Sequence, residues 1–332
     1  MAEELSNDKK KSLVDVQDIR RVWGLICNEI KKVLVGKLEE IEILWSAMLV
    51  GKHVYFEGVP GIAKTWMCNS FAKTMGCEFK RIQFTPDMLP SDIIGTNVFN
   101  PKTGTFYLRK GPIFTNICLA DEINRAPPKT QSALLEAMQE GQVTIEGETL
   151  KLPQPFIVIA TANPVEQEGT YPLPEAQLDR FLVKIRVDYP SPDEELDVIR
   201  LKNNPVAQEL KVVTSPEAIG MMQETVKHVY ISEDLMDYIR RIVVSTRQDP
   251  RLILGGSPRA SIALLESCKA RAAIHGRNYV VPDDIKTMLV HTVHHRLILR
   301  PEAQLEGIDQ IRISEDISRE AAVPVDLPLG ES

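Results

Sequence analysis

Apolar residues follow two different patterns along the chain, and the change between them lies near residue 190. Before it, short apolar runs alternate with segments in which apolar residues recur at helical spacing. The runs predict buried strands at residues 54–56, 80–84, 117–120, 156–161 and 182–187. The helical segments include residues 14–35, 38–50 and 66–75. This alternation predicts an α/β fold, with a parallel sheet and helices on both faces.

Two segments within this first part break the alternation. Residues 98–107 and 141–150 each alternate around a glycine-containing turn, at Gly104 and at Gly147. Both segments therefore predict β-hairpins. We expect the aromatic residues of the first hairpin, Phe106 and Tyr107, to be packing groups.

After residue 190 the patterns are helical. Residues 189–192 read Tyr-Pro-Ser-Pro, and proline interrupts regular structure there. One later helix should begin at Pro258 with Ser257 as its cap and should stop at Gly276. A chain of 332 residues suits two units, each with its own core. We expect a flexible amino terminus, an α/β core, an all-α helical lid and a C-terminal tail, at residues 1–14, 15–189, 190–312 and 313–332.

Composition narrows the class of protein without naming a function. Hydrophobic residues make up 43% of the chain and charged residues 26%, as in ordinary globular proteins. The net charge of −7 gives no overall basic footprint for nucleic acid, although a local basic groove is compatible with an acidic total, so nucleic acid is not a favoured partner. No apolar stretch approaches the roughly 18 residues of a membrane span, and the polar start is not a secretory signal. The five cysteines are scattered, which favours reduced core residues in a cytoplasmic protein.

The segment after the first predicted strand carries the clearest chemistry. A glycine-containing loop that leads into a helix presents backbone amides to phosphate groups. Gly58 and Gly61 permit the tight backbone, Lys64 can reach the β and γ phosphates of ATP, and Thr65 offers a hydroxyl to Mg²⁺. Ala63 departs from the usual pattern, which has glycine before the lysine. The residues expected to bind the nucleotide here are Gly58, Val59, Pro60, Gly61, Ile62, Ala63, Lys64, Thr65 and Trp66.

A second predicted strand ends in two carboxylates, Asp121 and Glu122. If this strand lies beside the loop strand, Asp121 reaches Mg²⁺ and Glu122 reaches a water that attacks the γ-phosphate. The simpler interpretation is a solvated strand end. Together with the glycine loop, the pair favours ATP hydrolysis.

At this point the chain resembles the AAA+ ATPases, and among them the MoxR family. The resemblance rests on residues 58–65 and on the segment Asp-Glu-Ile-Asn-Arg-Ala at 121–126, and it extends over residues 35–301. It implies that Asn163, after the strand at 156–161, orients the attacking water. A turn-forming asparagine before proline is the alternative for that residue.

The resemblance also implies an arginine finger at Arg180, supplied to the ATP of a neighbouring subunit. The alternative is an ion pair within the chain, with Asp179 or another acid. Arg259, in the first turn of the helix after Ser257, matches a second arginine that faces bound nucleotide. A phosphate would offset the unfavourable position of a cation at a helix amino terminus.

Three further features have weaker signals. Val35 and Gly36 match the residues that line the adenine pocket in the family, although a turn before a helix would look the same. The two hairpins resemble inserts of the AAA+ clade that contains MoxR and magnesium chelatase. His291 and His295 would share one helical face and suggest a metal site, but no third ligand is evident, and solvated histidines at a helix end fit better.

Taken together, these features predict a MoxR-type ATPase that binds ATP and Mg²⁺ between core and lid and works as a ring, by resemblance a hexamer. The resemblance implies a chaperone that remodels or matures client proteins, with a von Willebrand factor A domain protein as partner and metal or cofactor insertion among its roles. Three alternatives stay open: a nucleotide-gated scaffold with little hydrolysis, a small-molecule phosphotransferase and a DNA-remodelling motor. The client is not visible in the sequence.

Overall fold

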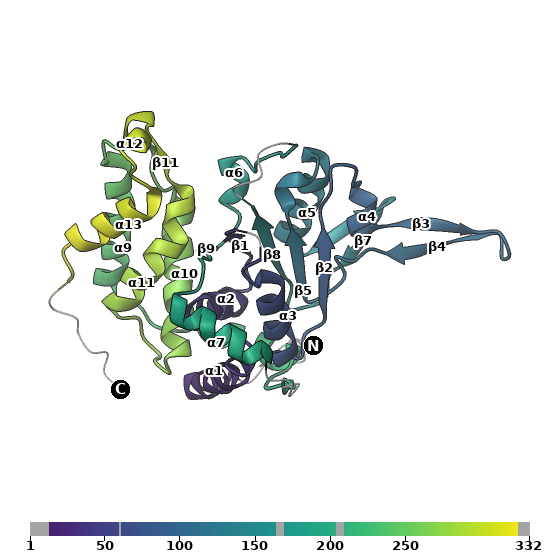
Figure 1. Cartoon of the computed structure of the whole chain (residues 1–332), viewed down its shortest axis with the longest axis horizontal. Helices are drawn as coiled ribbons and strands as arrows, with labels where there is room; N and C mark the ends of the chain where they lie inside the picture. The colour runs from purple at the N-terminus through teal and green to yellow at the C-terminus, as the bar shows by residue number, and fades with distance from the viewer. Residues whose placement is uncertain (1–12, 60, 164–168, 204–208, 325–332) are drawn as a thin grey trace, which may run out of the picture.

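The structure is a computed structural model, and it describes residues 13–59, 61–163, 169–203 and 209–324 of the chain. Figure 1 shows an α/β part that contains the central sheet, a helical part beside it, and a hairpin that projects away from both. The amino-terminal segment that we expect to be flexible lies, up to residue 12, outside the described residues.

A five-stranded parallel sheet forms the centre of the α/β part. Its order is β2-β5-β8-β1-β9, and every neighbouring pair is parallel. The strands are β1 (Val54–Glu57), β2 (Phe79–Gln83), β5 (Ile117–Asp121), β8 (Ile157–Ala162) and β9 (Val183–Arg186). Each lies within about one residue of its predicted position. Because the strands are parallel, all their carboxyl ends lie at one edge of the sheet, where open α/β sheets bind ligands.

Helices cover both faces of this sheet, as predicted. Alternate residues of each strand enter different apolar clusters: Leu119 packs on one face and Ala120 on the other. The helices of the α/β part are α1 (Val16–Ile30), α2 (Leu38–Val50), α3 (Lys64–Thr74), α4 (Pro90–Ile94), α5 (Pro128–Glu140) and α6 (Glu175–Leu178), with a 3₁₀ helix, η1 (Ile123–Arg125). The first three pack on one face and α5 on the other.

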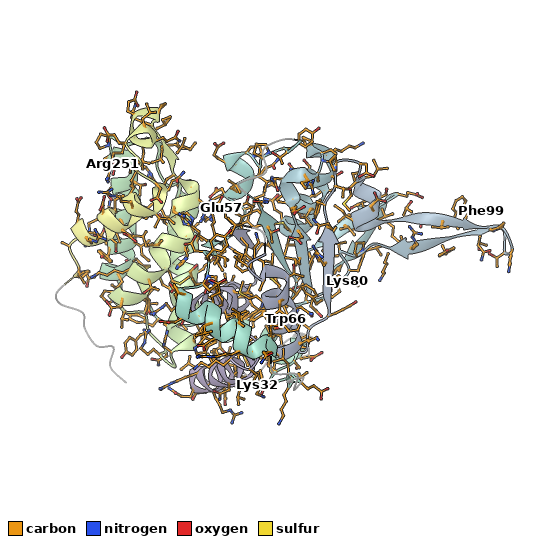
Figure 2. All side chains as sticks on the ribbon, viewed as in Figure 1. Lys32, Glu57, Trp66, Lys80, Phe99 and Arg251 are labelled. Atoms are coloured by element: carbon orange, nitrogen blue, oxygen red, sulfur yellow. The ribbon has the colours of Figure 1, made fainter. Side chains whose placement is uncertain are left out.

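Two antiparallel hairpins interrupt the α/β pattern where the sequence predicts them. They are β3 (Gly95–Asn100) with β4 (Thr105–Lys110), and β6 (Gln142–Ile145) with β7 (Glu148–Lys151). The first projects from the body, and Figure 2 shows Phe99 far out along it. Phe106 is 70% exposed and Tyr107 is 50% exposed. The expectation that they are packing groups of the core is therefore wrong: the ring of Phe106 packs against that of Phe99 across the hairpin, with 5.2 Å between centroids.

The second half is helical apart from one short antiparallel pair, β10 (Leu252–Leu254) with β11 (Ile298–Leu299). Its helices are α7 (Pro192–Asn203), α8 (Pro216–Lys227), α9 (Glu233–Gln248), α10 (Pro258–Ile274), α11 (Pro282–Val293), the 3₁₀ helix η2 (His294–Arg296), α12 (Pro301–Leu305) and α13 (Gln310–Glu320). The start of α10 confirms its predicted cap, because the Ser257 hydroxyl accepts a hydrogen bond from the Arg259 amide. Gly276 follows the helix end with a φ of 72°.

The two halves share one hydrophobic core. A single apolar cluster runs from the sheet face under α1 and α2 into α10, α11 and α13. The expectation of a separate core for each unit is therefore wrong. The boundary expected for the C-terminal tail, at residue 313, is also too early in the chain, because Ile313 and Ile317 of α13 are buried in this cluster.

The five cysteines have no disulfide bonds, and four of them are buried. In the part of the chain that the structure describes, none of the helices has both the length and the apolar character of a membrane span.

Candidate nucleotide-binding site

The phosphate loop joins the carboxyl end of β1 to the first turn of α3. Gly58 lies so close to its surroundings that a Cβ atom would be 2.4 Å from the Val187 carbonyl oxygen. Gly61 has a φ of 85°, which favours glycine. Lys64 is the first residue of α3, and its ammonium donates a hydrogen bond of 2.6 Å to the Gly58 carbonyl. The loop therefore curves around its lysine at a helix amino terminus, where anions bind.

Ala63 keeps the backbone turn although it is not glycine. Its φ of 60° and ψ of 23° are left-handed, and it stands immediately before α3. An L-residue pays about 1–2 kcal/mol in this region. The departure noted in the sequence is therefore accommodated by conformation, and the loop has the same course that glycine would allow.

The other residues expected to bind the nucleotide differ in how far they are buried. Ile62 packs against the main apolar cluster, and Val59 and Thr65 are half-buried. Trp66 is 45% exposed, donates from its indole to the Val33 carbonyl and lies under the Lys202 ammonium. Figure 2 shows its side chain on α3. Pro60 lies outside the described residues.

Lys64 lies near two carboxylates. Burial lowers the pKa of its ammonium, and the charges of Asp121 and Glu122 oppose that shift. Asp121 ends β5 and is 9% exposed. The structure thus brings the lysine of the loop and both predicted carboxylates to one edge of the sheet.

Both carboxylate oxygens of Asp121 have partners. The Thr161 hydroxyl donates to Oδ1 at 2.5 Å, and Arg81 Nε donates to Oδ2 at 2.9 Å. The sequence analysis missed Arg81 and Thr161. Thr161 lies within a predicted strand next to Asn163, a signal that could have been used, whereas Arg81 on β2 has no local signal.

Glu122 is held in a fixed position beside Asp121. It adopts a left-handed backbone with a φ of 57°, and its amide donates to the Thr161 hydroxyl at 2.9 Å. Gln83 donates to its carboxylate at 2.7 Å and Arg125 at 3.1 Å. These two partners were also missed, although Arg125 lies within the family-like segment at 121–126.

Asn163 directly follows β8 and is 5% exposed, so it lies at the same edge of the sheet. Val35 and Gly36 line a hollow of about 460 Å³ together with Lys31 and Leu34, which follow α1, and with the first turn of α2. The chain beyond β9 passes nearby, because the adjacent Lys37 donates to the Asp188 carbonyl at 3.2 Å. That segment begins at Val187, which also faces Gly58, so the predicted adenine pocket adjoins the phosphate loop.

Arg180 and Arg259 lie elsewhere. They line a second hollow, of about 530 Å³, with Lys52, His53 and Arg296 among its other residues. His53 precedes β1, and its carbonyl accepts the amide of Leu182, which precedes β9. Because β1 and β9 are parallel, this hollow lies at the amino edge of the sheet, opposite the phosphate loop.

The position of Arg259 corrects one expectation. We expected it to face the nucleotide of its own chain between core and lid, but its guanidinium lies 3.7 Å from Asp179, beside Arg180. The alternative for Arg180, an ion pair with Asp179, is not found: among the described residues no acid pairs with Arg180. The Asp179 carboxylate pairs instead with Arg296, at 2.7 Å.

The histidines near residue 294 also differ from expectation. His294 and His295 are 5% and 6% exposed, so they are not solvated at a helix end. Burial lowers the pKa of His294 to about 3 and that of His295 well below its usual value. His295 Nε2 lies 3.3 Å from the Phe181 carbonyl, so this segment packs on the loop that carries Arg180.

Comparison with known proteins shows the family of the chain. Residues 53–183 match the model of the ATPase family associated with various cellular activities (AAA), and residues 244–317 match that of the AAA lid domain. Chaperone MoxR1 of Mycobacterium tuberculosis is 42% identical over 306 residues, which are 89% of this chain and 81% of MoxR1.

The chain belongs to the MoxR family of AAA+ ATPases. YeaC of Bacillus subtilis, a protein without a characterised function, is 50% identical over 93% of this chain and 97% of its own. The crystal structure of a candidate ATPase from Cytophaga hutchinsonii superposes with a TM-score of 0.87, at 44% identity, over 93% of this chain and 97% of that one. The predicted resemblance to MoxR proteins and the predicted fold class are thus confirmed.

Proposed function

We propose that this MoxR protein binds and hydrolyses ATP at sites shared between neighbouring copies of the chain. The observation that carries the proposal is the separation of two half-sites. Lys64, Asp121 and Glu122 lie at the carboxyl edge of the sheet, and Arg180 with Arg259 lies at the opposite edge. A single chain cannot bring both sets to one nucleotide, but head-to-tail neighbours in a ring can.

The carboxyl edge has the groups that ATP and Mg²⁺ need. The amides of the phosphate loop and the Lys64 ammonium would hold the β and γ phosphates, and the hollow beside Val35 and Gly36 would take the adenine. The Thr65 hydroxyl and the Asp121 carboxylate are hard oxygen donors of the kind that Mg²⁺ prefers. The metal would supply charge neutralisation on the phosphates.

Hydrolysis would depend on two residues beside the loop. Glu122 is the base that would accept a proton from the attacking water, and Asn163 would help to orient that water. Gln83 and Arg125 both donate to Oε2 of Glu122, so these two contacts orient the carboxylate, and Oε1 would be the oxygen that accepts the proton.

The amino edge would serve the neighbouring subunit. Arg180 has no acidic partner among the described residues, and it shares its hollow with Arg259 and Lys52. Such a cluster of cations is suited to the γ-phosphate of another chain, and an arginine finger raises hydrolysis by about 10³- to 10⁵-fold. Arg259 would thus act on the nucleotide of the neighbour. A hexamer is the ring size that the family resemblance favours.

The work done by such a ring would be the remodelling or maturation of client proteins in the cytoplasm. Its support is family membership and the name of the relative MoxR1, a chaperone. By the same resemblance, a protein with a von Willebrand factor A domain is the expected partner, and insertion of a metal or cofactor into the client is a further expected role. The acidic net charge of −7 does not favour nucleic acid as the client.

Mixing two inactive variants tests the shared site. Glu122→Gln should bind ATP without hydrolysis, and Arg180→Ala should bind ATP but hydrolyse it at least 10³-fold more slowly. In a mixture, the first variant supplies an intact finger and the second an intact carboxyl edge. ATPase activity should reappear, and wild-type activity should rise with protein concentration.

Arg240→Gln is the matched control, because Arg240 is exposed on α9 and pairs with its helix neighbour Asp237. It should have wild-type activity. A mixture that stays inactive, although both variants fold and co-assemble, would refute the shared site. Phosphate transfer to a small molecule instead of water would indicate a phosphotransferase, and full activity of Glu122→Gln would refute the role of that residue.

A further inference from the structure

Arg296 holds the loop that carries the finger, and it does so from inside the protein. Its guanidinium Nε donates to Asp179 Oδ1 at 2.7 Å, and Nη2 donates to the Phe181 carbonyl at 2.7 Å. Nη1 donates to the Leu182 carbonyl at 3.2 Å and also to the Thr292 carbonyl. One side chain therefore fixes residues on both sides of Arg180.

Burial of the Arg296 guanidinium is costly in free energy. The Arg296 side chain is 4% exposed, and burial of a cation is unfavourable unless it is paired and hydrogen-bonded. Asp179 supplies the counter-charge, and the main-chain carbonyls accept the remaining hydrogens. An aliphatic residue of similar volume would stabilise the interior as well, so the retained charge indicates a demand for orientation.

The same carboxylate also reaches the second arginine. Asp179 Oδ1 faces Arg296, and Oδ2 lies 3.7 Å from Arg259, whose side chain is 66% exposed. The loop of residues 179–182 has no strand or helix of its own to fix it. The Leu182 amide is bound to the His53 carbonyl, and the Asp179 side chain and the carbonyls of Phe181 and Leu182 are bound by Arg296 of η2, which follows α11 of the lid.

We propose that Arg296, bound to Asp179, is a positioning residue that sets Arg180 and Arg259 for the nucleotide of the neighbouring subunit. The proposal rests on the shared site proposed above. It gives the lid a definite role in catalysis, because η2 carries the side chain that supports the finger loop. A displacement of α11 would shift that loop through Arg296.

The test is Arg296→Lys, which keeps the charge but loses the planar set of donors. A displacement of about 1 Å in a reacting group lowers a rate on the order of 100-fold, so kcat for ATP should fall by about that factor with KM unchanged. Mixed with Glu122→Gln, the variant should regain activity, because the partner then supplies a well-placed finger. Arg300→Lys is the control, since Arg300 is exposed and lies four residues further along the chain.

The mixture separates this role from general loss of structure. A purely structural defect would damage the variant's own phosphate site, and an added finger would not restore it. If Arg296→Lys does not fold, Asp179→Asn weakens the same contact by removing its negative charge, and this variant is then used in the mixture in place of Arg296→Lys. The proposal is overturned if Arg296→Lys and Asp179→Asn keep the wild-type kcat. It is also overturned if Glu122→Gln restores activity to Arg180→Ala but not to Arg296→Lys or Asp179→Asn. If Glu122→Gln does not restore activity to Arg180→Ala, the shared site itself is refuted, and this inference is refuted with it.

Discussion

Arg81 contacts the same oxygen of Asp121 with two of its nitrogens, Nε at 2.9 Å and Nη2 at 2.6 Å. Asp121 is the carboxylate that we propose as a ligand of Mg²⁺. The guanidinium of Arg81 therefore competes with the metal for one oxygen of this carboxylate. Because the Arg81 side chain is 47% exposed, the competition should be mild.

Replacement of Arg81 should consequently ease metal binding. In Arg81→Gln, the Mg²⁺ concentration for half-maximal ATPase activity should fall, by up to about 5-fold for a pair worth at most ~1 kcal/mol. A titration of activity with Mg²⁺ at saturating ATP measures the shift. Arg240→Gln, which removes an exposed arginine of α9, should leave the midpoint in place. A midpoint that moves upwards would show that Arg81 supports the site and does not compete for it.

Substitutions in the phosphate loop should affect stability in opposite directions. Ala63→Gly relieves a left-handed alanine worth about 1–2 kcal/mol and adds flexibility to the unfolded chain worth about 0.4–1 kcal/mol. The free energy of unfolding should therefore rise by up to about 1.6 kcal/mol. Gly58→Ala places a Cβ atom 2.4 Å from the Val187 carbonyl oxygen, so this substitution should lower the free energy of unfolding by about 1–3 kcal/mol. Urea unfolding of both variants checks this, and a stabilised Gly58→Ala would contradict the close approach of Gly58 to Val187.

Mild acid should destabilise the fold through its buried histidines. Burial lowers the pKa of His53 to about 4 and that of His294 to about 3. Since the unfolded forms take up protons near pH 6.5, the unfolded chain binds more protons below that pH. The stabilisation is therefore complete above pH 6.5 and is lost as the pH falls towards 4, by up to about 1.4 kcal/mol per pH unit for each residue.

Comparison of variants assigns this loss to a residue. In His53→Gln, the dependence of unfolding free energy on pH between 6.5 and 4.5 should be less steep than in the wild type. His228→Gln, at an exposed position after α8, should retain the wild-type slope. Equal slopes in all three proteins would show that His53 takes up its proton in the folded state as readily as in the unfolded one.

A buried carboxylate at the start of α11 should be essential for the lid. Asp284 is 0% exposed and accepts from Arg271 and Arg277, each at 2.7 Å, and from the Val281 amide at 3.0 Å. Asp284→Asn would leave the Arg277 guanidinium without its counter-charge and Arg271 with Glu42, 3.4 Å away, as its remaining acid, which should cost about 3–5 kcal/mol. Asp283→Asn, an exposed neighbour, should cost much less. Thermal unfolding of the two variants measures the difference in stability, and similar midpoints would contradict the role of Asp284 as the counter-charge of these arginines.

The sequence could predict the elements of the site that are local. The strand positions followed from apolar runs, and the phosphate loop with Asp121 and Glu122 followed from residue types at the ends of those strands. It could not predict Arg81 or Gln83, because their partners lie about 40 positions away and are brought close only by the pairing of β2 with β5. The sequence similarly shows a helix end at His294 but not the loop that buries it.

The error on Arg259 has the same origin. Its place in the first turn of α10 was predicted correctly, but the direction of that helix depends on packing against α2, more than 200 residues earlier. Local pattern cannot specify such a contact. The family resemblance named the residue, and only the tertiary structure shows that it lies beside Asp179.

Helix α2 joins the two half-sites within each chain. Its first turn follows Val35 and Gly36, and its last turn leads to Lys52 in the hollow of Arg180. Thirteen residues make a rod of roughly 20 Å, and most of its side chains are buried. In a ring of such chains, one stiff helix would connect each ATP site to the next. A change at one nucleotide would therefore displace the arginines that reach the neighbouring nucleotide.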